Sequence, residues 1–387
     1  MSGTVSRRVL VPFGTRPEII KLAPVVRALR AAGHQVTTVD TGQHATPAMA
    51  ADVQRDVGLA PDVRLTLPDG PGRFGLLAAG AAEVLATHAV DLVLALGDTH
   101  TVPAYALAAR NAGLPFVHLE AGLRSFNERS VEEANRRVAA ALAQLHLAPT
   151  ARAAAFLAAE GVPEERVVVV GNPVIDAVRE RGIAPVEVAR RDGVLVTAHR
   201  ASNVDDPERL ARLVELVAAL ATHVGPVLFP VHPRTAARLR EFDLERRLAA
   251  LPGVTVREPL PYPRLLRALA ASRLTVTDSG GLQEEAAYFG VPVVLLRRST
   301  PRWEGVELGS TVLTGLTSDA EAERALAAAR QLSSPAEQER VAALPCPYGD
   351  GTTGRRVAEL LADPAISRLL RLTEPDFTDG RRPWDPA

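Results

Sequence analysis

Three acidic positions in the first half of the chain could carry proton-transfer chemistry. Asp98 follows the apolar run Leu92–Leu96, Glu120 follows the run Pro115–Leu119, and Glu132 opens a helical pattern soon after. Because parallel strands end at one edge of a sheet, these carboxylates are expected to converge on one pocket. Crowded carboxylates raise one another's pKa, which suits abstraction of a proton. For Asp98 taken alone, an N-cap role fits equally well.

The start of the first predicted helix has the composition of an anion site. Gly14 and Pro17 flank a turn, and Arg16 and Lys21 would lie near the helix N-terminus. Backbone N–H groups and the helix dipole attract anions at such a place. The alternative is a well-capped helix with solvated charges. Lys21 is the only lysine among 44 basic residues, which favours a function.

The segment 278–285, DSGGLQEE, is the most informative one. It follows the apolar run Leu274–Thr277 and begins with a serine and two glycines, namely Ser279, Gly280 and Gly281. The glycines let backbone N–H groups approach a phosphate. Glu284 and Glu285, one turn further on, could accept hydrogen bonds from ribose hydroxyls. The segment therefore predicts a grip on a nucleotide-diphosphate sugar.

Two His-Arg pairs follow strands of the second half. His199 and Arg200 end the run Gly193–Thr197, and His232 with Arg234 repeats the arrangement later. Such pairs at a strand end are typical of phosphate or leaving-group contacts. In the first half, Glu133 beside Glu132 is interpreted as a residue that complements the helix dipole.

Other site types are not indicated. No GxGxxG or GxxxxGK[ST] motif follows a predicted strand, so NAD, FAD and ATP are not expected. No His, Asp or Glu cluster has metal-ligand spacing, and Cys346 is the only cysteine. We therefore expect no cofactor, no metal and no internal disulfide.

Apolar runs alternate with helical patterns along most of the chain. Such runs separated by helices indicate doubly wound parallel sheets in the α/β class. Ten strands are predicted, at 9–13, 35–40, 92–96, 115–119, 166–170, 193–197, 227–230, 254–257, 274–277 and 292–296. Helices are predicted, for example, at 18–32, 102–111, 132–143, 207–221 and 262–271.

The strand rhythm stops near Val170 and restarts at Gly193, which predicts two Rossmann-like domains facing a central cleft. The expected parts are a first domain at 1–170, a second at 171–353, a helix at 354–372 that packs back on the first domain, and an extended tail at 373–387.

The charge balance excludes several classes of partner. The chain has 387 residues, 44 basic and 45 acidic, with a net charge of −1. A nucleic-acid binder usually has a basic excess, and a membrane span needs about 18 consecutive apolar residues. Neither pattern is present in the sequence. We expect a cytoplasmic protein that binds neither nucleic acid nor membranes.

Eight motifs together resemble those of a known family. They are FGTRPEIIKLAP (13–24), TGQH (41–44), GDT (97–99), HLEAGLRS (118–125), EEANRR (132–137), GNPVID (171–176), HR (199–200) and DSGGLQEEAAYFGVPVV (278–294). In this order they resemble the non-hydrolysing UDP-N-acetylglucosamine 2-epimerases, over about residues 9–365. The resemblance implies a GT-B-like fold and, commonly, a homodimer. It also implies interconversion of UDP-GlcNAc and UDP-ManNAc by anti-elimination of UDP to 2-acetamidoglucal and re-addition.

The same resemblance implies roles for single residues. Catalytic roles fall on Asp98, Glu120, Glu132 and His199. UDP-sugar contacts fall on Arg16, Lys21, Arg136, Ser279, Gly280, Gly281 and Glu285.

Three departures from the family pattern bear on regulation and specificity. Residues 199–203 read HRASN with Ser202 in place of a charged residue, 300–304 read TPRWE, and no Pro-Gly-Gln segment is recognisable near 65–74. In bacterial members a second UDP-GlcNAc acts as activator, with contacts that match Gln43, Arg200 and His232. We therefore expect weakened or absent allosteric activation, and altered sugar specificity through Trp303.

Three alternative functions stay open from the sequence. A GT-B glycosyltransferase would share the serine-glycine-glycine grip but would not need three carboxylates in the first half. A hydrolysing epimerase would release free ManNAc and UDP. A catalytically inactive sugar-nucleotide sensor would not need Asp98, Glu120, Glu132 and His199. For the pathway served, cell-envelope polysaccharide is the default expectation and an amino-sugar natural product is the alternative.

Overall fold

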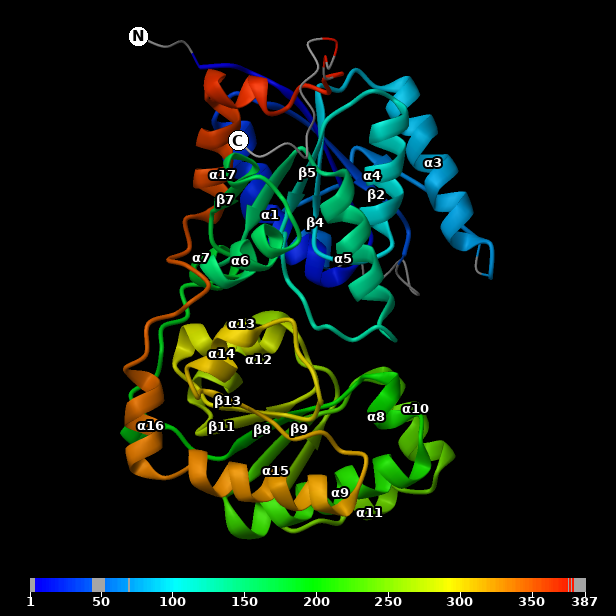
Figure 1. The fold of residues 1–387 in the computed structure, drawn as a ribbon. Coiled ribbons are helices and arrows are strands. Elements are labelled where there is room, and N and C mark those ends of the chain that lie inside the picture. Colours follow the sequence, from blue (N-terminus) through cyan, green and yellow to red (C-terminus); the bar gives the residue numbers. More distant parts are fainter. Residues whose placement is uncertain (1–3, 44–52, 69, 375, 377, 379–387) are drawn as a thin grey trace.

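Two parallel α/β sheets, one in each half of the chain, build the molecule (Figure 1). A computed structural model describes residues 4–43, 53–68, 70–374, 376 and 378. All strand pairs in both sheets are parallel, so the predicted doubly wound class is confirmed.

The first sheet has seven strands in the order β3-β2-β1-β4-β5-β6-β7. Their bounds are β1 (Arg8–Phe13), β2 (Gln35–Asp40), β3 (Val63–Arg64), β4 (Leu92–Leu96), β5 (Phe116–Leu119), β6 (Leu145–Ala148) and β7 (Val167–Val169). The pairing of β4 with β5 sets Leu96 opposite Leu119. The residues that follow these two strands therefore emerge side by side at one edge of the sheet.

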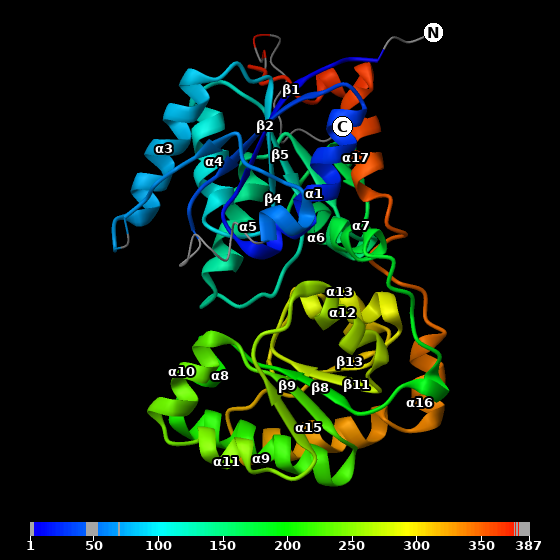
Figure 2. The ribbon, with the colours of Figure 1, turned by 180° about the vertical axis from the view of Figure 1, so that it is seen from behind.

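Helices cover both faces of the first sheet (Figures 1 and 2). They are α1 (Arg16–Ala31), α3 (Arg73–Thr87), α4 (Thr101–Asn111), α5 (Val131–Leu142), α6 (Ala151–Ala159), η1 (Glu164–Arg166), α7 (Pro173–Glu180), α17 (Thr353–Ala362) and η3 (Pro364–Arg368). Along β1, Val9, Val11 and Phe13 pack with the α1 and α17 side chains, whereas Leu10 packs with α3 and α4. This burial on both faces explains why the strand reads as an unbroken apolar run.

The second sheet has six strands in the order β10-β9-β8-β11-β12-β13. Their bounds are β8 (Val194–Thr197), β9 (Val227–Pro230), β10 (Val254–Arg257), β11 (Leu274–Thr277), β12 (Val293–Leu295) and β13 (Thr311–Leu313). Thr197 lies opposite Thr277, so the turns after β8 and β11 also emerge side by side.

The helices of this half are η2 (Val188–Arg190), α8 (Ala201–Val204), α9 (Pro207–His223), α10 (Pro233–Glu241), α11 (Glu245–Ala249), α12 (Tyr262–Ala271), α13 (Gly281–Phe289), α14 (Trp303–Glu307), α15 (Asp319–Leu332) and α16 (Pro335–Ala342). Side chains of α9 and α15 pack on one face of the sheet. Those of α12 and α13 join the cluster on the other face.

The chain crosses between the two halves twice. It passes through α7, which packs against α1 and also contacts α13. It returns through α17, which lies along α1 in both views (Figures 1 and 2). The nitrogen Arg7 Nε donates to the Leu361 carbonyl at 2.6 Å and ties this helix to β1. The predicted domain boundaries stay a prediction, and most of the predicted tail lies outside the described residues.

All ten predicted strands form, with ends within one residue of the prediction. Three short strands, β3, β6 and β13, were not predicted. They have two to four residues, which is too short for a periodicity signal. Within the described ranges, no helix is long and apolar enough to cross a membrane.

Candidate active site

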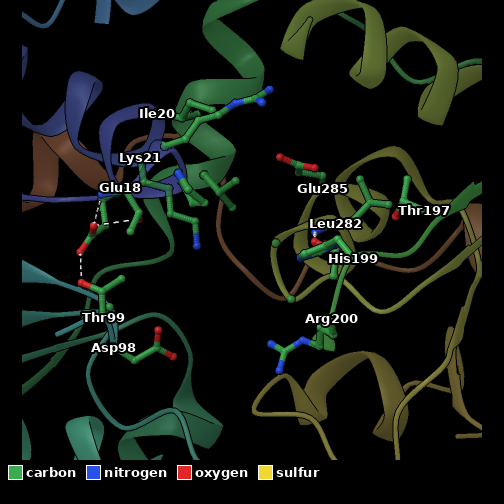
Figure 3. Close-up of a pocket in the computed structure, with 18 of the residues that line it drawn as sticks. Glu18, Ile20, Lys21, Asp98, Thr99, Thr197, His199, Arg200, Leu282 and Glu285 are labelled. Carbon is green, nitrogen blue, oxygen red and sulfur yellow. Dashed lines mark hydrogen bonds between the residues drawn. The ribbon is translucent and has the colours of Figure 1, made fainter. Parts of the chain in front are cut away.

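A cavity of about 490 Å³ lies between the carboxyl ends of the two sheets. Figure 3 shows Glu18, Lys21, Asp98 and Thr99 on one wall and His199, Arg200 and Glu285 on the other. Most of the predicted site residues line it, namely Arg16, Lys21, Asp98, Glu120, Glu132, Arg136, His199, Arg200, His232, Ser279, Gly280, Gly281 and Glu285. Gln43, Arg234 and Glu284 do not.

The turns after β4 and β5 bring Asp98 and Glu120 to the cavity. Gly97 has a φ of +82°, and Glu120 has a φ of +63°, which is the left-handed region. A left-handed backbone costs a non-glycine residue roughly 1–2 kcal/mol. A methyl group on Gly97 would lie 3.5 Å from a carboxylate oxygen of Glu120. The turn is thus shaped to hold this carboxylate in place, and such strain is typical of functional residues.

The ammonium group of Lys21 is already paired with two carboxylates. Its ammonium group contacts the carboxylate of Glu120 and donates to Glu284 Oε2 at 2.9 Å. Burial raises the pKa of Glu120, and the charge of Lys21 opposes this shift. The interpretation of Arg16 and Lys21 as two cations that await an anion is therefore wrong for Lys21.

Arg136 links Asp98 to a second buried carboxylate. Its guanidinium contacts Asp98 on one side and Glu133 Oε2 at 2.6 Å on the other. Glu133 also accepts the N–H of Ser125 at 2.8 Å. Glu133 was interpreted as complementing the helix dipole, but it is buried and holds Arg136 in position. Two carboxylates on one arginine fix the direction of its fork.

Glu132 lies beside this group at the start of α5. Burial would raise its pKa, but a hydrogen bond from Ser130 Oγ at 2.5 Å and nearby arginines, including Arg200, lower the pKa below its usual range. Glu132 is therefore ionised near neutral pH.

Glu18 is a cavity residue that the sequence did not predict as functional. It accepts hydrogen bonds from the N–H groups of Gly14 at 3.0 Å and Thr15 at 2.7 Å, and from Thr99 Oγ1 at 2.7 Å. Burial raises its pKa to about 7. The carboxylate occupies the N-terminus of α1, so the anion site predicted there is filled by the protein itself.

The N-terminus of α13 is accessible from the cavity. Ser279, Gly280 and Gly281 line the cavity, and a Cβ added to Gly281 would meet nothing within 4 Å. Arg302 lies beside this turn, 3.1 Å from the position that a Cβ of Gly280 would take. A helix N-terminus with open space and an adjacent guanidinium suits a phosphate group.

The two glutamates of α13 have different environments. Glu285 lines the cavity and accepts the hydroxyl of Tyr262 at 2.8 Å, and burial raises its pKa to about 7. Glu284 is fully buried and is paired with Lys21 and Arg302. The expectation that both would bind ribose is therefore wrong for Glu284.

His199 is held by an aspartate that was not predicted as a site residue. Its Nδ1 lies 3.2 Å from Asp278 Oδ1, and its ring lies 5.3 Å from that of His232. Burial would raise the pKa of Asp278, but its bonds to His199, Arg200 and Asn203 lower the pKa below its usual range. An ionised partner at Nδ1 orients the imidazole and sets its tautomer.

Of the three residues predicted as remnants of an activator site, two line the cavity and one does not. Arg200 and His232 line the cavity, whereas Gln43 lies in the first half and bonds to Thr41 Oγ1 at 3.3 Å and to Thr101. The neighbouring His44 is outside the described residues.

Arg297 is a further cationic residue of the cavity without a signal in the sequence. Its Nη1 is buried and makes no hydrogen bond within the part of the chain that the structure describes. Burial and the charges of Arg200 and Arg302 lower its pKa to about 9. An unsatisfied guanidinium beside two other arginines favours an anionic ligand.

Trp303 lies away from the cavity and joins the two halves. Its indole N–H donates to the carbonyl of Arg124 at 2.8 Å, and its ring lies 6.4 Å from Phe126. Nearby, Arg152 pairs with Glu307 at 2.6 Å. Trp303 does not line the cavity, so the structure gives no support to its predicted effect on sugar specificity.

The acids of the cavity are paired with arginine, lysine or hydroxyl groups. Among the described residues, no group of three or more His, Cys, Asp and Glu could hold a metal ion.

Comparison with known proteins identifies the family of the chain. The family model described as UDP-N-acetylglucosamine 2-epimerase matches residues 27–362. The chain belongs to this family. A "Probable UDP-N-acetylglucosamine 2-epimerase" of Ralstonia nicotianae is 37% identical, over 92% of this chain and 98% of the relative. A "UDP-2,3-diacetamido-2,3-dideoxy-D-glucuronate 2-epimerase" of Pseudomonas aeruginosa is 34% identical, over 92% of this chain and 99% of the relative.

A solved family structure has the same arrangement of domains. The Methanocaldococcus jannaschii UDP-GlcNAc 2-epimerase, in complex with UDP-GlcNAc and UDP, matches with a TM-score of 0.79 and 33% identity. The match covers 92% of this chain and 99% of that one. The predicted GT-B-like fold and the membership of an epimerase family are thus confirmed.

Proposed function

We propose that this family member is a non-hydrolysing UDP-N-acetylglucosamine 2-epimerase that interconverts UDP-GlcNAc and UDP-ManNAc. One observation carries the proposal. A single cavity joins the carboxylates after β4 and β5 to the open N-terminus of α13. A nucleotide sugar that spans this cavity would place its diphosphate at one wall and its sugar at the other.

The binding wall is formed by the second half of the chain. The N–H groups of Gly280 and Gly281 and the guanidinium of Arg302 would hold the diphosphate, and Glu285 would accept hydrogen bonds from the ribose hydroxyls. Their place in the cavity supports these roles. Arg16 would contact the substrate from the facing wall, and Lys21 would do so while paired with Glu120.

The facing carboxylates would perform the proton transfers. A base removes the proton from C2, the C1–O bond to UDP breaks, and the pair of electrons left at C2 forms the double bond of 2-acetamidoglucal. UDP then returns to C1 while C2 receives a proton on the opposite face. Removal of the proton from one face of C2 and its return to the other face require two acid–base groups. Glu120, Asp98 and Glu132 are the candidates.

Cations near the leaving group lower the barrier to elimination. UDP departs with additional negative charge, which His199, Arg200 and Arg297 can stabilise from fixed positions. His199 is oriented for this by Asp278. A cavity that holds the glycal and UDP together favours re-addition over release.

The test is NMR of the purified protein with UDP-GlcNAc in D2O. We expect deuterium at C2, accumulation of UDP-ManNAc and little free UDP. Deuterated free ManNAc with stoichiometric UDP would instead indicate a hydrolysing epimerase. A C2 that stays protonated while UDP-GlcNAc binds would contradict the assignment of the carboxylates and favour a transferase or a sensor.

The Pseudomonas relative gives a second substrate for the same experiment. UDP-2,3-diacetamido-2,3-dideoxy-glucuronate carries an additional carboxylate on the sugar. Faster C2 exchange with this compound than with UDP-GlcNAc would contradict the proposed substrate. The Glu120→Gln variant, which keeps the size of the side chain, is the matched control and is expected to lose about 100-fold or more of the exchange rate.

We also propose that activation by a second UDP-GlcNAc is weak or absent. Gln43 does not line the cavity that Arg200 and His232 line, and it bonds instead to Thr41, which supports this proposal. Hyperbolic UDP-GlcNAc kinetics are expected. Sigmoidal kinetics, or a need for trace UDP-GlcNAc in the direction from UDP-ManNAc, would contradict the proposal.

A homodimer through the first half is the assembly that we propose. Exposed apolar side chains lie on three neighbouring helices, α3, α4 and α5, namely Phe74, Leu76, Leu107, Val131 and Val138. Clustered apolar residues on a surface are typical of protein interfaces. The cytoplasmic location expected from the sequence stays a prediction.

A further inference from the structure

Glu284 is a buried carboxylate at the centre of contacts between the two halves. Its side chain is fully buried on α13, and it does not line the cavity. It accepts hydrogen bonds at 2.9 Å from Lys21 Nζ, from Asn172 Nδ2 and from Arg302 Nε. Three charged or polar donors on one buried carboxylate leave it little freedom to move.

The three donors come from different parts of the fold. Lys21 is on α1 in the first half, Asn172 is the N-cap of α7, and Arg302 precedes α14 in the second half. Glu284 therefore holds together both walls of the cavity and the segment that connects them. Loss of one partner of such a cluster leaves the other charges buried and unpaired.

Two of the donors are themselves cavity residues. Lys21 lines the cavity and contacts Glu120, which is a candidate for proton transfer. Arg302 lies beside Gly280 at the open N-terminus of α13. The position of Glu284 thus determines the position of one group at the proton-transfer wall and one at the phosphate wall.

Glu284 also competes with Glu120 for the ammonium group of Lys21. Burial raises the pKa of Glu120, Lys21 lowers it, Glu284 raises it again, and Arg302 lowers it from the facing wall. Without Glu284, the ammonium group would pair with Glu120 alone. The pKa of Glu120 would then fall, and its carboxylate would be a weaker base.

We propose that Glu284 is a positioning residue for proton transfer, which acts through Lys21 on Glu120 and through Arg302 on the phosphate wall. This inference rests on the proposed epimerase function. It assigns to the first glutamate of the DSGGLQEE segment a role in the chemical step, separate from ribose binding by Glu285.

The test compares Glu284→Gln with Glu321→Gln. Glu321 is a buried, arginine-paired glutamate of α15 in the same half, and it does not line the cavity. We expect Glu284→Gln to lower the rate of C2 deuterium exchange about 10- to 100-fold through Lys21, and to weaken UDP binding by a smaller factor through Arg302. The acid limb of its kcat/KM profile should move to lower pH. Glu321→Gln should change neither the exchange rate nor the pH profile.

A double-mutant cycle separates positioning from a general structural role. If Glu284 acts through Lys21, the variant with both Lys21→Gln and Glu284→Gln should lose little more exchange than Lys21→Gln alone. Glu284→Asp, which restores the charge on a shorter side chain, should recover part of the rate. The inference would be overturned if the losses of exchange rate in the two single variants were additive in the double variant. It would also be overturned if the acid limb of the kcat/KM profile did not move in Glu284→Gln.

Two controls keep the outcomes distinct. If Glu284→Gln does not fold, the comparison of Glu284→Asp with wild type takes its place, and a wild-type rate and pH limb in that variant would overturn the inference. The wild-type protein is measured alongside. A wild type that binds UDP-GlcNAc without C2 exchange would overturn the proposed function and this inference together, whereas an active wild type with an equally active Glu284→Gln variant would overturn this inference only.

Discussion

The carboxylates around the cavity differ in protonation because their immediate neighbours differ. Glu18 and Glu285 are buried with hydroxyl or N–H partners, and the pKa of each is raised to about 7. Glu132 and Asp278 have cationic neighbours, and the pKa of each is lowered below its usual range. Acid–base catalysis at neutral pH uses such pairs of groups with separated pKa values.

Glu18 leads to a prediction about stability and pH. Its pKa is about 7 in the native state and 4.5 in the reference state, so the native protein binds the extra proton between these values. The contribution of this group to the free energy of unfolding is therefore fully present below about pH 4.5, and it is lost as the pH rises through about 7. Glu18→Gln can keep the bonds to Gly14 and Thr15 through its oxygen and can donate to Thr99. We expect its Tm to depend less on pH between about 4.5 and 7 than that of wild type.

The measurement is thermal unfolding of both proteins across that pH range. A Glu18→Gln variant with the same pH slope as wild type would contradict the prediction. Its stability at pH 8 is expected to equal or exceed that of wild type.

Arg297 leads to a prediction about affinity. Because its buried Nη1 makes no hydrogen bond within the described residues, it is available to an anionic ligand. We expect Arg297→Gln to raise the KM for UDP-GlcNAc about 10-fold or more, since bonds to charged groups contribute roughly 1.5–3 kcal/mol. The exposed Arg298 next to it, which pairs with Glu321, is the matched control. An unchanged KM in Arg297→Gln would show that this guanidinium does not contact the substrate.

At the scale of elements, α1 and α13 both begin at the cavity, but their N-termini differ. The N-terminus of α1 is closed by the carboxylate of Glu18. The N-terminus of α13 begins with glycine and faces open space. Both helices carry a glutamate in the first turn, but Glu18 accepts the N–H groups at the start of α1, whereas Glu284 pairs with Lys21 and Arg302.

The open N-terminus predicts the effect of one methyl group. Gly281→Ala places a Cβ into open space at the first residue of α13, without a positive φ. We expect unchanged or slightly higher stability, because alanine is favoured over glycine in helices by about 1 kcal/mol. We also expect weaker UDP binding, since the methyl group would occupy the phosphate position.

The control for this prediction is Gly75→Ala on α3. Its added Cβ also meets nothing within 4 Å, but Gly75 does not line the cavity. Calorimetry of UDP binding should therefore separate the two variants, with affinity lost only in Gly281→Ala. Equal UDP affinity in both variants would argue against a phosphate at this turn.

At the scale of the whole molecule, the two halves are joined around the cavity at several places. Trp303 bonds to the carbonyl of Arg124, and Glu284 bonds to Lys21. The helix α17 returns from the second half to pack on α1 (Figure 1). The outer face of α3, α4 and α5 takes no part in these contacts.

That outer face predicts the assembly state. Leu107 on α4 has 41% of its surface exposed between exposed residues of α3 and α5. We expect Leu107→Glu to convert a homodimer into a monomer, because a charge would be buried at the interface. Light scattering after size-exclusion chromatography measures this. Val169→Glu, at an exposed valine on β7 outside that face, should leave the dimer intact. A wild-type monomer would contradict the proposed assembly.

Much of the fold and of the cavity could be predicted from local sequence. Apolar runs buried on both faces by flanking helices carry a clear signal, so ten strands were located within one residue. Parallel strands end at one edge, so residues after the strands, such as Asp98 and His199, were expected to share a cleft. The serine and two glycines at 279–281 predict an open helix N-terminus, because their side chains are small or absent.

Side-chain partners far apart in the chain were decided only by the tertiary structure. Lys21 meets Glu284 across 263 positions, Glu18 meets Thr99 across 81, and Trp303 meets Arg124 across 179. No local pattern encodes such pairs, because they depend on how two sheets and their connecting helices pack. The same residue types would suit an open anion site or a closed ion cluster. The packing of the two halves places Lys21 and Glu284 in a closed ion cluster. It leaves Glu285 and Gly281 at the cavity.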